Sequence, residues 1–421
     1  MIYNNPHWSV NAGNVVQGDK SSIGDQIKLD AALKQAVIEA QRKRYFSQMS
    51  SVTGMPKNSG KTVKKNKYIP ILDDRNVNDQ GIDAAGGNSK QNNPQGNLWG
   101  SSKDIAMITG RMPTVRETGG RVNRIGFTRQ IIEAKLTKLG FFYDFTQDMM
   151  DFDSDSMLLS HLARESLNAA TEIDEKMIAI DLVNGARVPL FTGAATAISN
   201  VTAGTGAENS LVTYHDLQRM NVMLNDNHAP KTLQAITGSR MVDSKIVGSG
   251  RVLYIPSAME NTIRNLHDSF GAPAFIPVEK YMAADKKTLQ GEIGTVAAFR
   301  VVVAEEMPYF AGSGAEATDA AAKAKYRSSK AYVVNGGHTG TEKWDVFPLL
   351  AVSSEAFTTV GMGLSGGKGS DMKFKIKTKL PGEVSIEDPY GLNGVSSIQW
   401  NHGVLIDNPE HIGVIYTVAE V

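Results

Sequence analysis

The chain has 421 residues, which is enough for two or three domains with a substantial core. Its 44 basic and 44 acidic side chains cancel, and this balance disfavours a dedicated nucleic-acid-binding protein, which normally carries a basic excess. It has no cysteine, which excludes disulfides, thiolate catalysis and cysteine-based zinc sites and is compatible with folding in a reducing cytoplasm. The first residues lack the basic and apolar regions of a signal peptide, and no run of about 18 apolar residues predicts a membrane-spanning helix.

The chain is predicted to begin with an arm and a helix. Residues 1–24 are polar and rich in glycine and asparagine, which favours a flexible arm. Residues 25–46 then place leucine and alanine side chains at helical spacing. Basic residues in the last turns complement the helix dipole, so a helix is expected to end near residue 46.

The most informative segment is the long polar stretch between Tyr45 and Asp151. Ordinary connections rarely exceed about 15 residues, so a segment of about a hundred is either disordered or ordered by a partner. Strand patterning at both ends favours the second option, a projecting arm that other subunits hold in place. The chain is therefore predicted to build an assembly from copies of itself.

Within that segment, strand-like runs flank a region of turn chemistry. A basic stretch ends in the run Lys67–Leu72, and residues 73–100 are rich in Asp, Asn and Gly. Further extended runs are predicted at 122–128 and 131–146. The runs at 68–72 and 131–145 are expected to pair as the two sides of one long hairpin.

Acidic residues between Asp151 and Asp155 predict the start of a helix of about 30 residues that ends near Asn184 and Gly185. At 1.5 Å per residue this helix is roughly 45 Å long, far longer than the mean globular helix. One face is predicted to be apolar and carries Leu158, Leu162, Ala169, Ile173, Met177 and Ile180. The core between this helix and the sheets packed on it is expected to contain Leu158, Leu162, Ile173 and Met177.

After residue 210 the pattern alternates between short helices and strands. Residues 213–216 are predicted to begin a helix that turns Leu217, Met220 and Leu224 inward, and Ser257–Glu260 has the sequence of a capping box. Strands are predicted at 233–237, 252–255, 295–304, 332–335, 347–352 and 412–418. The Gly- and Ala-rich residues 312–325 are expected to form a mobile surface loop.

A lysine-rich strand is predicted at 373–380, where apolar and basic residues alternate strictly. Its lysines, which share one face, are Lys373, Lys375, Lys377 and Lys379. One interpretation is a solvated strand face that discourages pairing with another sheet edge. The other is contact with an acidic partner or with packaged nucleic acid, and the zero net charge of the chain favours the first.

Three short motifs resemble functional sites, but each one lacks a feature that the corresponding site requires. Gly54–Thr62 resembles a phosphate-binding loop, but five residues separate its glycines where the loop needs four. Gly361–Gly366 has the letters of a dinucleotide-binding motif, but a strand follows it and not a helix. The aspartates at 151–155 lack the glycine and the final carboxylate of a calcium loop. We therefore predict no catalytic residue, no cofactor and no metal, and the protein is not expected to be an enzyme.

Several stretches, taken in order along the chain, point to one family. They include residues 55–62 (MPKNSGKT), residues 68–83 (YIPILDDRNVNDQGID) and residues 140–148 (GFFYDFTQD). Further stretches lie at 254–260, 291–296, 301–308, 388–394 and 398–403. Together they resemble the major capsid proteins of tailed double-stranded-DNA bacteriophages, and the podovirus group related to coliphage N-four is the most similar. The resemblance spans roughly residues 43–418.

The resemblance implies the Johnson fold, an α+β fold that combines an N-terminal arm, an extended two-stranded loop, a long spine helix, a peripheral domain and an axial domain. Mapped on this chain, the arm and first helix occupy 1–55 and the extended loop occupies 56–147. The spine helix and part of the peripheral domain would be 148–210. The axial domain would be 211–350, and the peripheral sheet with the C-terminal strand would be 351–421.

The resemblance also implies a function. Copies would assemble as hexamers and pentamers into the icosahedral head that encloses the phage double-stranded DNA, with no sequence-specific binding to it. Other expected partners are a portal protein and scaffold or decoration proteins, with no membrane. The chain is expected to assemble in the host cytoplasm and to be located in the capsid of the virion. Candidate contacts between subunits are Tyr68, Ile69, Ile71, Leu72, Asp73, Asp74 and Arg75.

Two alternatives stay open at this point. An encapsulin-like shell protein would share the fold but not the stretch at 55–83, and its shells would contain a cargo enzyme and not DNA. A soluble nucleotide-binding α/β enzyme that uses one of the incomplete motifs would bind ATP or NAD saturably.

Overall fold

The computed structural model describes most of the chain from residue 129 onward and shorter pieces before it. The described residues are 9–11, 14–16, 45–55, 60–68, 129–152, 158–204, 209–231, 233–236, 244–247, 250–281, 289–333, 337–362, 374–382 and 388–420. The helix predicted at 25–46 lies outside these ranges except for its last two residues, and the turn region predicted at 73–100 lies outside them entirely. Within the described residues, no helix has both the length and the apolar character needed to cross a membrane.

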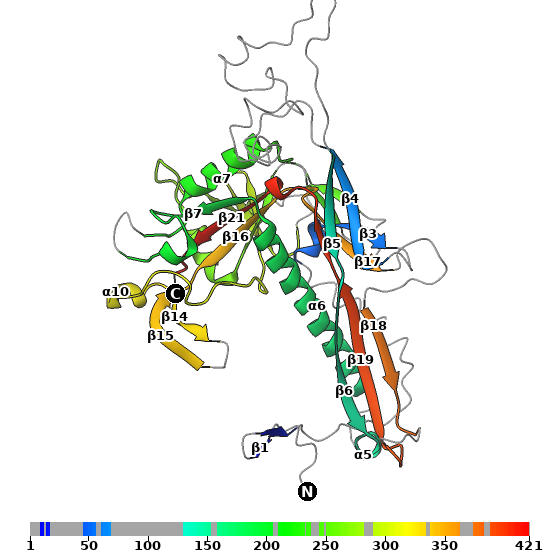
Figure 1. Ribbon diagram of the computed structural model, residues 1–421. Coiled ribbons are helices and arrows are strands. Elements are labelled where there is room, and N and C mark those ends of the chain that lie inside the picture. Colours follow the sequence, from blue (N-terminus) through cyan, green and yellow to red (C-terminus); the bar gives the residue numbers. More distant parts are fainter. Residues whose placement is uncertain are drawn as a thin grey trace, which may run out of the picture.

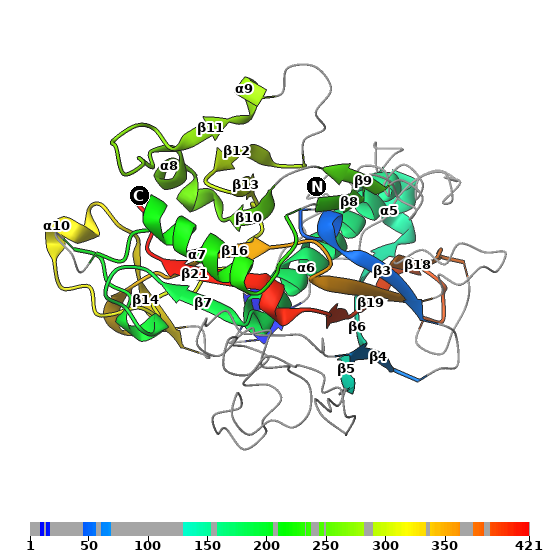
Figure 2. The same cartoon turned by 90° about the horizontal axis from the view of Figure 1, so that it is seen from above.

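A seven-stranded mixed sheet forms the larger part of the body (Figure 2). Its strand order is β11-β12-β13-β10-β16-β21-β7, with parallel pairing of β10 with β13 and of β21 with β7. The strands are β7 (Val188–Phe191), β10 (Arg251–Ile255), β11 (Phe275–Pro277), β12 (Glu292–Val296), β13 (Phe299–Val303), β16 (Phe347–Val352) and β21 (Ile412–Thr417). Three of them, β10, β16 and β21, are buried along their whole length, which is the pattern of strands covered on both faces.

Each face of this sheet has its own core. On one face, α7 (Tyr214–Asp226) and α8 (Glu260–Arg264) pack against strand residues such as Leu253 and Ile415. On the other face, the C-terminal part of α6 (Leu158–Gly185) packs against residues such as Tyr254 and Val414. Successive side chains of a strand point to opposite faces, so each apolar strand contributes to both cores.

The helix α6 extends away from the body and carries a second sheet along its length (Figure 1). That sheet has the antiparallel order β18-β19-β6, made of β18 (Phe374–Lys379), β19 (Asn393–His402) and β6 (Thr137–Thr146). Alternate residues of β19, including Ile398 and Trp400, pack against Leu167 and Ala170 of α6. The short helix α5 (Gln147–Phe152) lies at the far end of this rod.

A two-stranded hairpin joins the other end of the rod. It pairs β4 (Thr62–Tyr68) with β5 (Arg129–Lys135), and Leu136 connects β5 directly to β6. The base of the hairpin packs on a small sheet with the order β20-β17-β3, through a cluster that includes Leu136 and Leu405. The strands of that sheet are β3 (Ser51–Met55), β17 (Phe357–Met362) and β20 (Val404–Ile406).

The remaining elements are short. The strand pairs are β1 (Ser9–Asn11) with β2 (Asn14–Val16), β8 (Leu233–Ile236) with β9 (Ser244–Val247), and β14 (Ser328–Val333) with β15 (Gly337–Trp344). The helices are α9 (Val278–Tyr281) and α10 (Ala320–Lys323), with the 3-10 turns η2 (Ser47–Met49), η4 (Ile198–Asn200), η5 (Ser257–Met259) and η6 (Pro409–His411).

Most of the predicted elements are confirmed. Helix α7 begins at the Thr213 cap with a complete capping box, and its inward residues Leu217, Met220 and Leu224 are fully buried. The predicted pairing of 68–72 with 131–145 is confirmed only in part, because β4 pairs with residues 129–135 while residues 137–146 pair with β19. Tyr68 lies opposite Arg129, and the ladder extends back to Thr62 where the prediction began at residue 68.

The prediction that Ile173 lies on the buried face of α6 was wrong. That side chain is 40% exposed, Met177 is half-buried and Leu162 is half-buried against Phe145, while the Leu158 side chain lies outside the described part of the structure. The buried face lies further round the helix and carries Ala163, Leu167, Ala170, Thr171, Asp174, Glu175, Ile178, Ala179, Leu182 and Val183. Because three of these residues are polar, an apolar pattern with helical spacing selects the neighbouring face instead.

Three local predictions were also wrong. The run at 295–304 is two strands, because Ala297 takes a positive φ of 51° and the chain reverses between β12 and β13. Ser257 begins a 3-10 turn behind Pro256, and no side chain caps that turn. The segment 312–325 is not a plain surface loop, since it contains α10, the Gly314 amide donates to the Trp344 carbonyl and Ala322 is buried in the core.

The domain boundaries predicted at 210 and 350 cut through the seven-stranded sheet. Strand β7 precedes the first boundary and β21 follows the second, yet the two strands pair with each other beside β16. Sequence order does not reveal this pairing, because the partner strands are more than two hundred residues apart.

Candidate assembly surfaces

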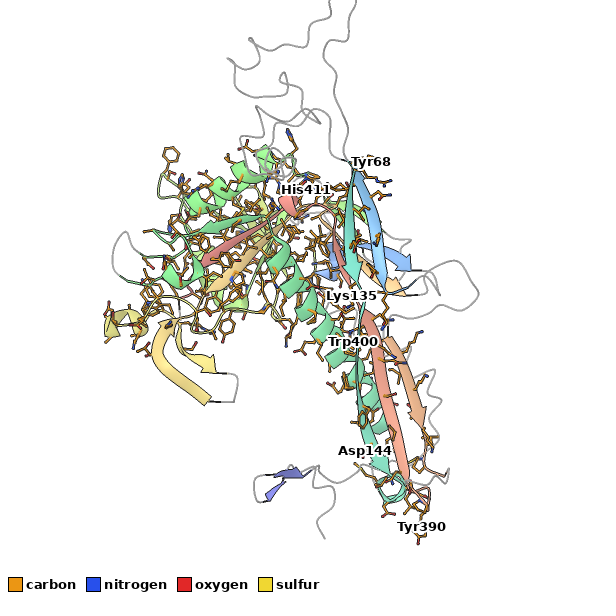
Figure 3. The ribbon with its side chains drawn as sticks, viewed as in Figure 1. Tyr68, Lys135, Asp144, Tyr390, Trp400 and His411 are labelled. Atoms are coloured by element: carbon orange, nitrogen blue, oxygen red, sulfur yellow. The ribbon has the colours of Figure 1, made fainter. Side chains whose placement is uncertain are left out.

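The outward face of the β4–β5 hairpin is one candidate surface. It carries Tyr68, which is 61% exposed, and the exposed Ile131 on the neighbouring strand (Figure 3). Lys64 and Glu133 form an ion pair of 2.7 Å on the same face. Of the seven predicted contact residues, only Tyr68 lies in the described part of the chain. The other six, Ile69, Ile71, Leu72, Asp73, Asp74 and Arg75, lie outside it.

The face of the long sheet that points away from α6 is a second candidate. Its β18 edge exposes Lys375, Lys377 and Lys379, and Phe142 on β6 is exposed on the same face. The predicted alternation of the strand is therefore confirmed for these three lysines, while Lys373 lies outside the described residues. Tyr390 is exposed at the far end of the rod (Figure 3).

A third candidate is the turn between α8 and β11, which holds the most exposed large apolar side chain among the described residues. Phe270 is 96% exposed, while the backbone of its turn is held by hydrogen bonds. The Asp268 carboxylate accepts hydrogen bonds from the amides of Phe270 and Ala272, both at 2.9 Å. Gly271 completes the turn with a φ of 79°, a conformation that favours glycine. Sequence analysis missed this site, although an aromatic residue inside an Asp-x-x-Gly turn is a visible signal.

The segment that leads out of the N-terminal region is fixed to the spine helix. The buried Glu175 accepts a hydrogen bond of 2.8 Å from the Phe46 amide and is also bonded to the Ser47 hydroxyl. The Tyr254 hydroxyl donates to the Tyr45 carbonyl at 3.0 Å, and the ring of Tyr254 packs against Phe46. Glu175 therefore serves as an internal anchor, which explains why the buried face of α6 contains a carboxylate.

A second internal polar site joins α6 to the long sheet. His402 of β19 lies between two carboxylates of α6, with Nδ1 3.1 Å from Asp174 and Nε2 2.9 Å from Asp181. Burial lowers the pKa of His402, but the hydrogen bonds that the ring donates to both carboxylates, together with their negative charge, outweigh this effect and raise the pKa from 6.5 to about 9. Asp174 and Asp181 are seven residues apart, which places both on one helix face.

None of the incomplete motifs forms a site in the described residues. The residues at the end of Gly54–Thr62 enter strand β4, where a phosphate-binding loop would enter a helix. Gly361 lies at the end of strand β17, and Asp151 lies in α5. No group of carboxylate or histidine side chains able to hold a metal ion is found in the part of the chain that the structure describes.

These features define a class of protein. The fold combines a body, a long rod and a projecting hairpin with exposed apolar residues on each, and its polar clusters link elements of the subunit to one another. That is the construction of a structural subunit that associates with other subunits.

Comparison with known proteins identifies the family. A family model described as phage capsid protein matches residues 130–366. The chain is 45% identical over 406 residues to the major capsid protein of Pseudomonas phage KPP21, covering 96% of both chains. The capsid of Ralstonia phage GP4 has a similar fold, with a TM-score of 0.52, 12% identity and coverage of 90% of this chain and 92% of that one. The capsid of Cyanophage P-SCSP1u matches with a TM-score of 0.45 and 12% identity over 97% and 92% of the two chains.

The chain therefore belongs to the family of phage major capsid proteins. The predicted α+β Johnson fold is confirmed, and so is the prediction that the chain is a structural protein and not an enzyme. It is a virion component that assembles in many copies into a capsid shell.

Proposed function

We propose that copies of this chain form hexamers and pentamers that close into an icosahedral head around double-stranded DNA. The supporting observation is the β4–β5 hairpin, which lies at the side of the body and exposes Tyr68 and Ile131 on its outward face. A strand pair of this kind can lie across a neighbouring subunit and bury apolar area there without a core of its own.

The proposal extends to the phage group, the parts of the fold, the contact residues and the partner proteins. The sequence stretches at 55–62 and 68–83 favour the N-four-like podovirus group. Residues 56–147 serve as the extended loop, and the seven-stranded sheet with α7 and α8 serves as the axial domain. The intersubunit contacts include Tyr68, Ile69, Ile71, Leu72, Asp73, Asp74 and Arg75. A portal protein and scaffold or decoration proteins complete the head in the host cytoplasm.

The test is electron microscopy and size-exclusion chromatography of the chain expressed alone and with candidate scaffold proteins. Shells, hexamers, pentamers or curved sheets are the expected products, and DNA is expected inside heads isolated from infected cells. A chain that stays monomeric under every condition would contradict the proposal, and heads filled with a cargo enzyme would favour the encapsulin-like alternative.

Deletion of residues 75–100 is expected to leave a folded subunit that no longer assembles. The deletion removes the Asn- and Gly-rich part of the extended segment and keeps both β4 and β5. Circular dichroism and thermal unfolding should match those of the full chain, because the described cores lie elsewhere. Normal shells from the shortened chain would refute the contact role of this segment.

Substitution of Phe270 by serine is expected to raise the concentration needed for assembly by at least about ten-fold. Phenylalanine and other aromatic residues are enriched in protein interfaces, and a ten-fold change corresponds to about 1.4 kcal/mol. The unfolding free energy of the subunit should change by less than about 0.5 kcal/mol, since Phe270 is almost fully exposed. Phe270→Tyr is the control, because it keeps the ring, and light scattering during assembly measures both variants.

A further inference from the structure

We propose that four charged residues form a tether that sets the direction in which the β4–β5 hairpin leaves the body. The tether consists of Lys65 and Lys67 on β4 and of Asp407 and Glu410 in the turn before β21. The proposal rests on the proposed function of the hairpin as the arm that lies across a neighbouring subunit. It assigns the positioning of that arm to contacts within the subunit itself.

The tether contacts are specific. The ammonium group of Lys65 lies 2.8 Å from Asp407 Oδ1. The ammonium group of Lys67 lies 2.9 Å from Glu410 Oε1 and donates to the Asp407 carbonyl at 3.2 Å. The Glu410 side chain is only 4% exposed and that of Lys67 is 22% exposed, so this pair is screened by salt far less than a surface pair.

The turn that receives the lysines, residues 407–411, is itself fixed to the body. The amides of Asp407 and Asn408 both donate to the Ala356 carbonyl, at 2.9 and 3.0 Å. The Arg187 amide, just after α6, donates to the Pro409 carbonyl at 3.2 Å. The Asn227 side chain, at the end of α7, donates to the Glu410 carbonyl at 3.1 Å. The turn is therefore a rigid platform held by α6, α7 and the chain before β17.

The hairpin touches the body at two separate points. Near its base, Val63 and Leu136 pack with Val360 and Leu405. Lys67 lies four residues further along β4, which is about 13 Å for an extended strand. One contact alone would leave the hairpin free to pivot, whereas two contacts at that separation define a direction.

The two faces of β4 have different roles. Val63, Lys65 and Lys67 alternate along the strand and point to the body. Lys64 points the other way and pairs with Glu133 across the hairpin, where both side chains are at least half exposed. The Lys64–Glu133 pair is therefore a matched control for the Lys67–Glu410 pair. Its length is similar, but it lies within the hairpin and does not join the hairpin to the body.

A distance measurement tests the tether directly. The chain has no cysteine, so spin labels attach only where cysteines are introduced. We would label Asn66→Cys on the hairpin and Val222→Cys on α7, both exposed positions, and record the distance distribution in the unassembled subunit. The neutral pair K67M/E410Q removes the buried ion pair without leaving a lone buried charge, and K64M/E133Q is the matched control.

The expected result is a narrow distribution in the parent and in K64M/E133Q, and a distribution at least twice as wide in K67M/E410Q. Equal widths in all three proteins would overturn the tether. The variants are compared only after circular dichroism shows equal helix and strand content. If K67M/E410Q fails to fold, K65M, which removes only the more exposed pair with Asp407, takes its place and should broaden the distribution in the same sense.

Assembly provides the second readout. K67E is expected to reduce the yield of closed shells at least ten-fold, and the charge swap K67E/E410K is expected to restore most of it. A swap that assembles no better than K67E would overturn the positioning role. A parent chain that forms no shells would instead contradict the proposed function, and the label distances would still decide whether the tether exists.

Discussion

Replacement of Leu167 by aspartate is expected to destabilise the subunit by more than about 4 kcal/mol, because it places an unpaired charge in a closed apolar cluster. Leu167 is 1% exposed and packs with Phe374, Ile398 and Trp400 between α6 and the long sheet. Leu167→Ala should cost about 2–5 kcal/mol, the range for a leucine removed from a packed core. Urea unfolding of unassembled subunits measures both.

The matched control is Ile173→Asp on the same helix. Ile173 belongs to the apolar stripe that the sequence pattern selects, but it is partly exposed. Its substitution should cost less than about 1 kcal/mol, as for other surface sites. Equal losses at Leu167 and Ile173 would mean that the helix presents a different face to the sheet.

The free energy of unfolding is expected to fall by roughly 3 kcal/mol at most as the pH rises from 6.5 to 9, through the titration of His402. The folded-state pKa of about 9 lies above the ordinary value of 6.5, so the protonated ring stabilises the folded state. This stabilisation is complete below pH 6.5 and is lost as the pH rises through the folded-state pKa. The partial exposure of Asp181 screens one of the two contacts and makes the figure an upper limit.

His402→Gln is the variant that tests this linkage. Glutamine keeps a hydrogen-bonding side chain but does not titrate, so the stability of the variant should change much less between pH 6.5 and pH 9. His215→Gln, at an exposed position on α7, should keep the slope of the parent. Parallel stability curves for the parent and His402→Gln would exclude His402 as the source of the pH dependence.

The parts of the fold that follow from local pattern were predictable. The Thr213 cap, the largely apolar runs of β10, β16 and β21, and the alternation of β18 all rely on spacing within a few residues. The extended hairpin before a long helix was also predictable, because composition changes sharply there. The identity of the family rested on the order of several stretches, and a 45% identical capsid protein confirms it.

The functional surfaces were less predictable, and the reason is physical. The buried face of α6 includes Asp174 and Glu175, whose partners are His402 on β19 and the backbone of Phe46. The tether joins Lys65 and Lys67 to residues more than three hundred positions away. A single sequence does not reveal which charges meet, so spacing rules treat buried and exposed polar residues alike.

The position of β21 has a consequence for how the subunit is made. This strand comes after all others of the seven-stranded sheet in the sequence, yet it lies between β16 and β7 and is completely buried. During translation, β16 and β7 are made first, and the edge of each that pairs with β21 stays unpaired until β21 has left the ribosome. A chain that stops before β21 leaves β16 and β7 without the strand that joins them, so we expect that it cannot complete the seven-stranded sheet.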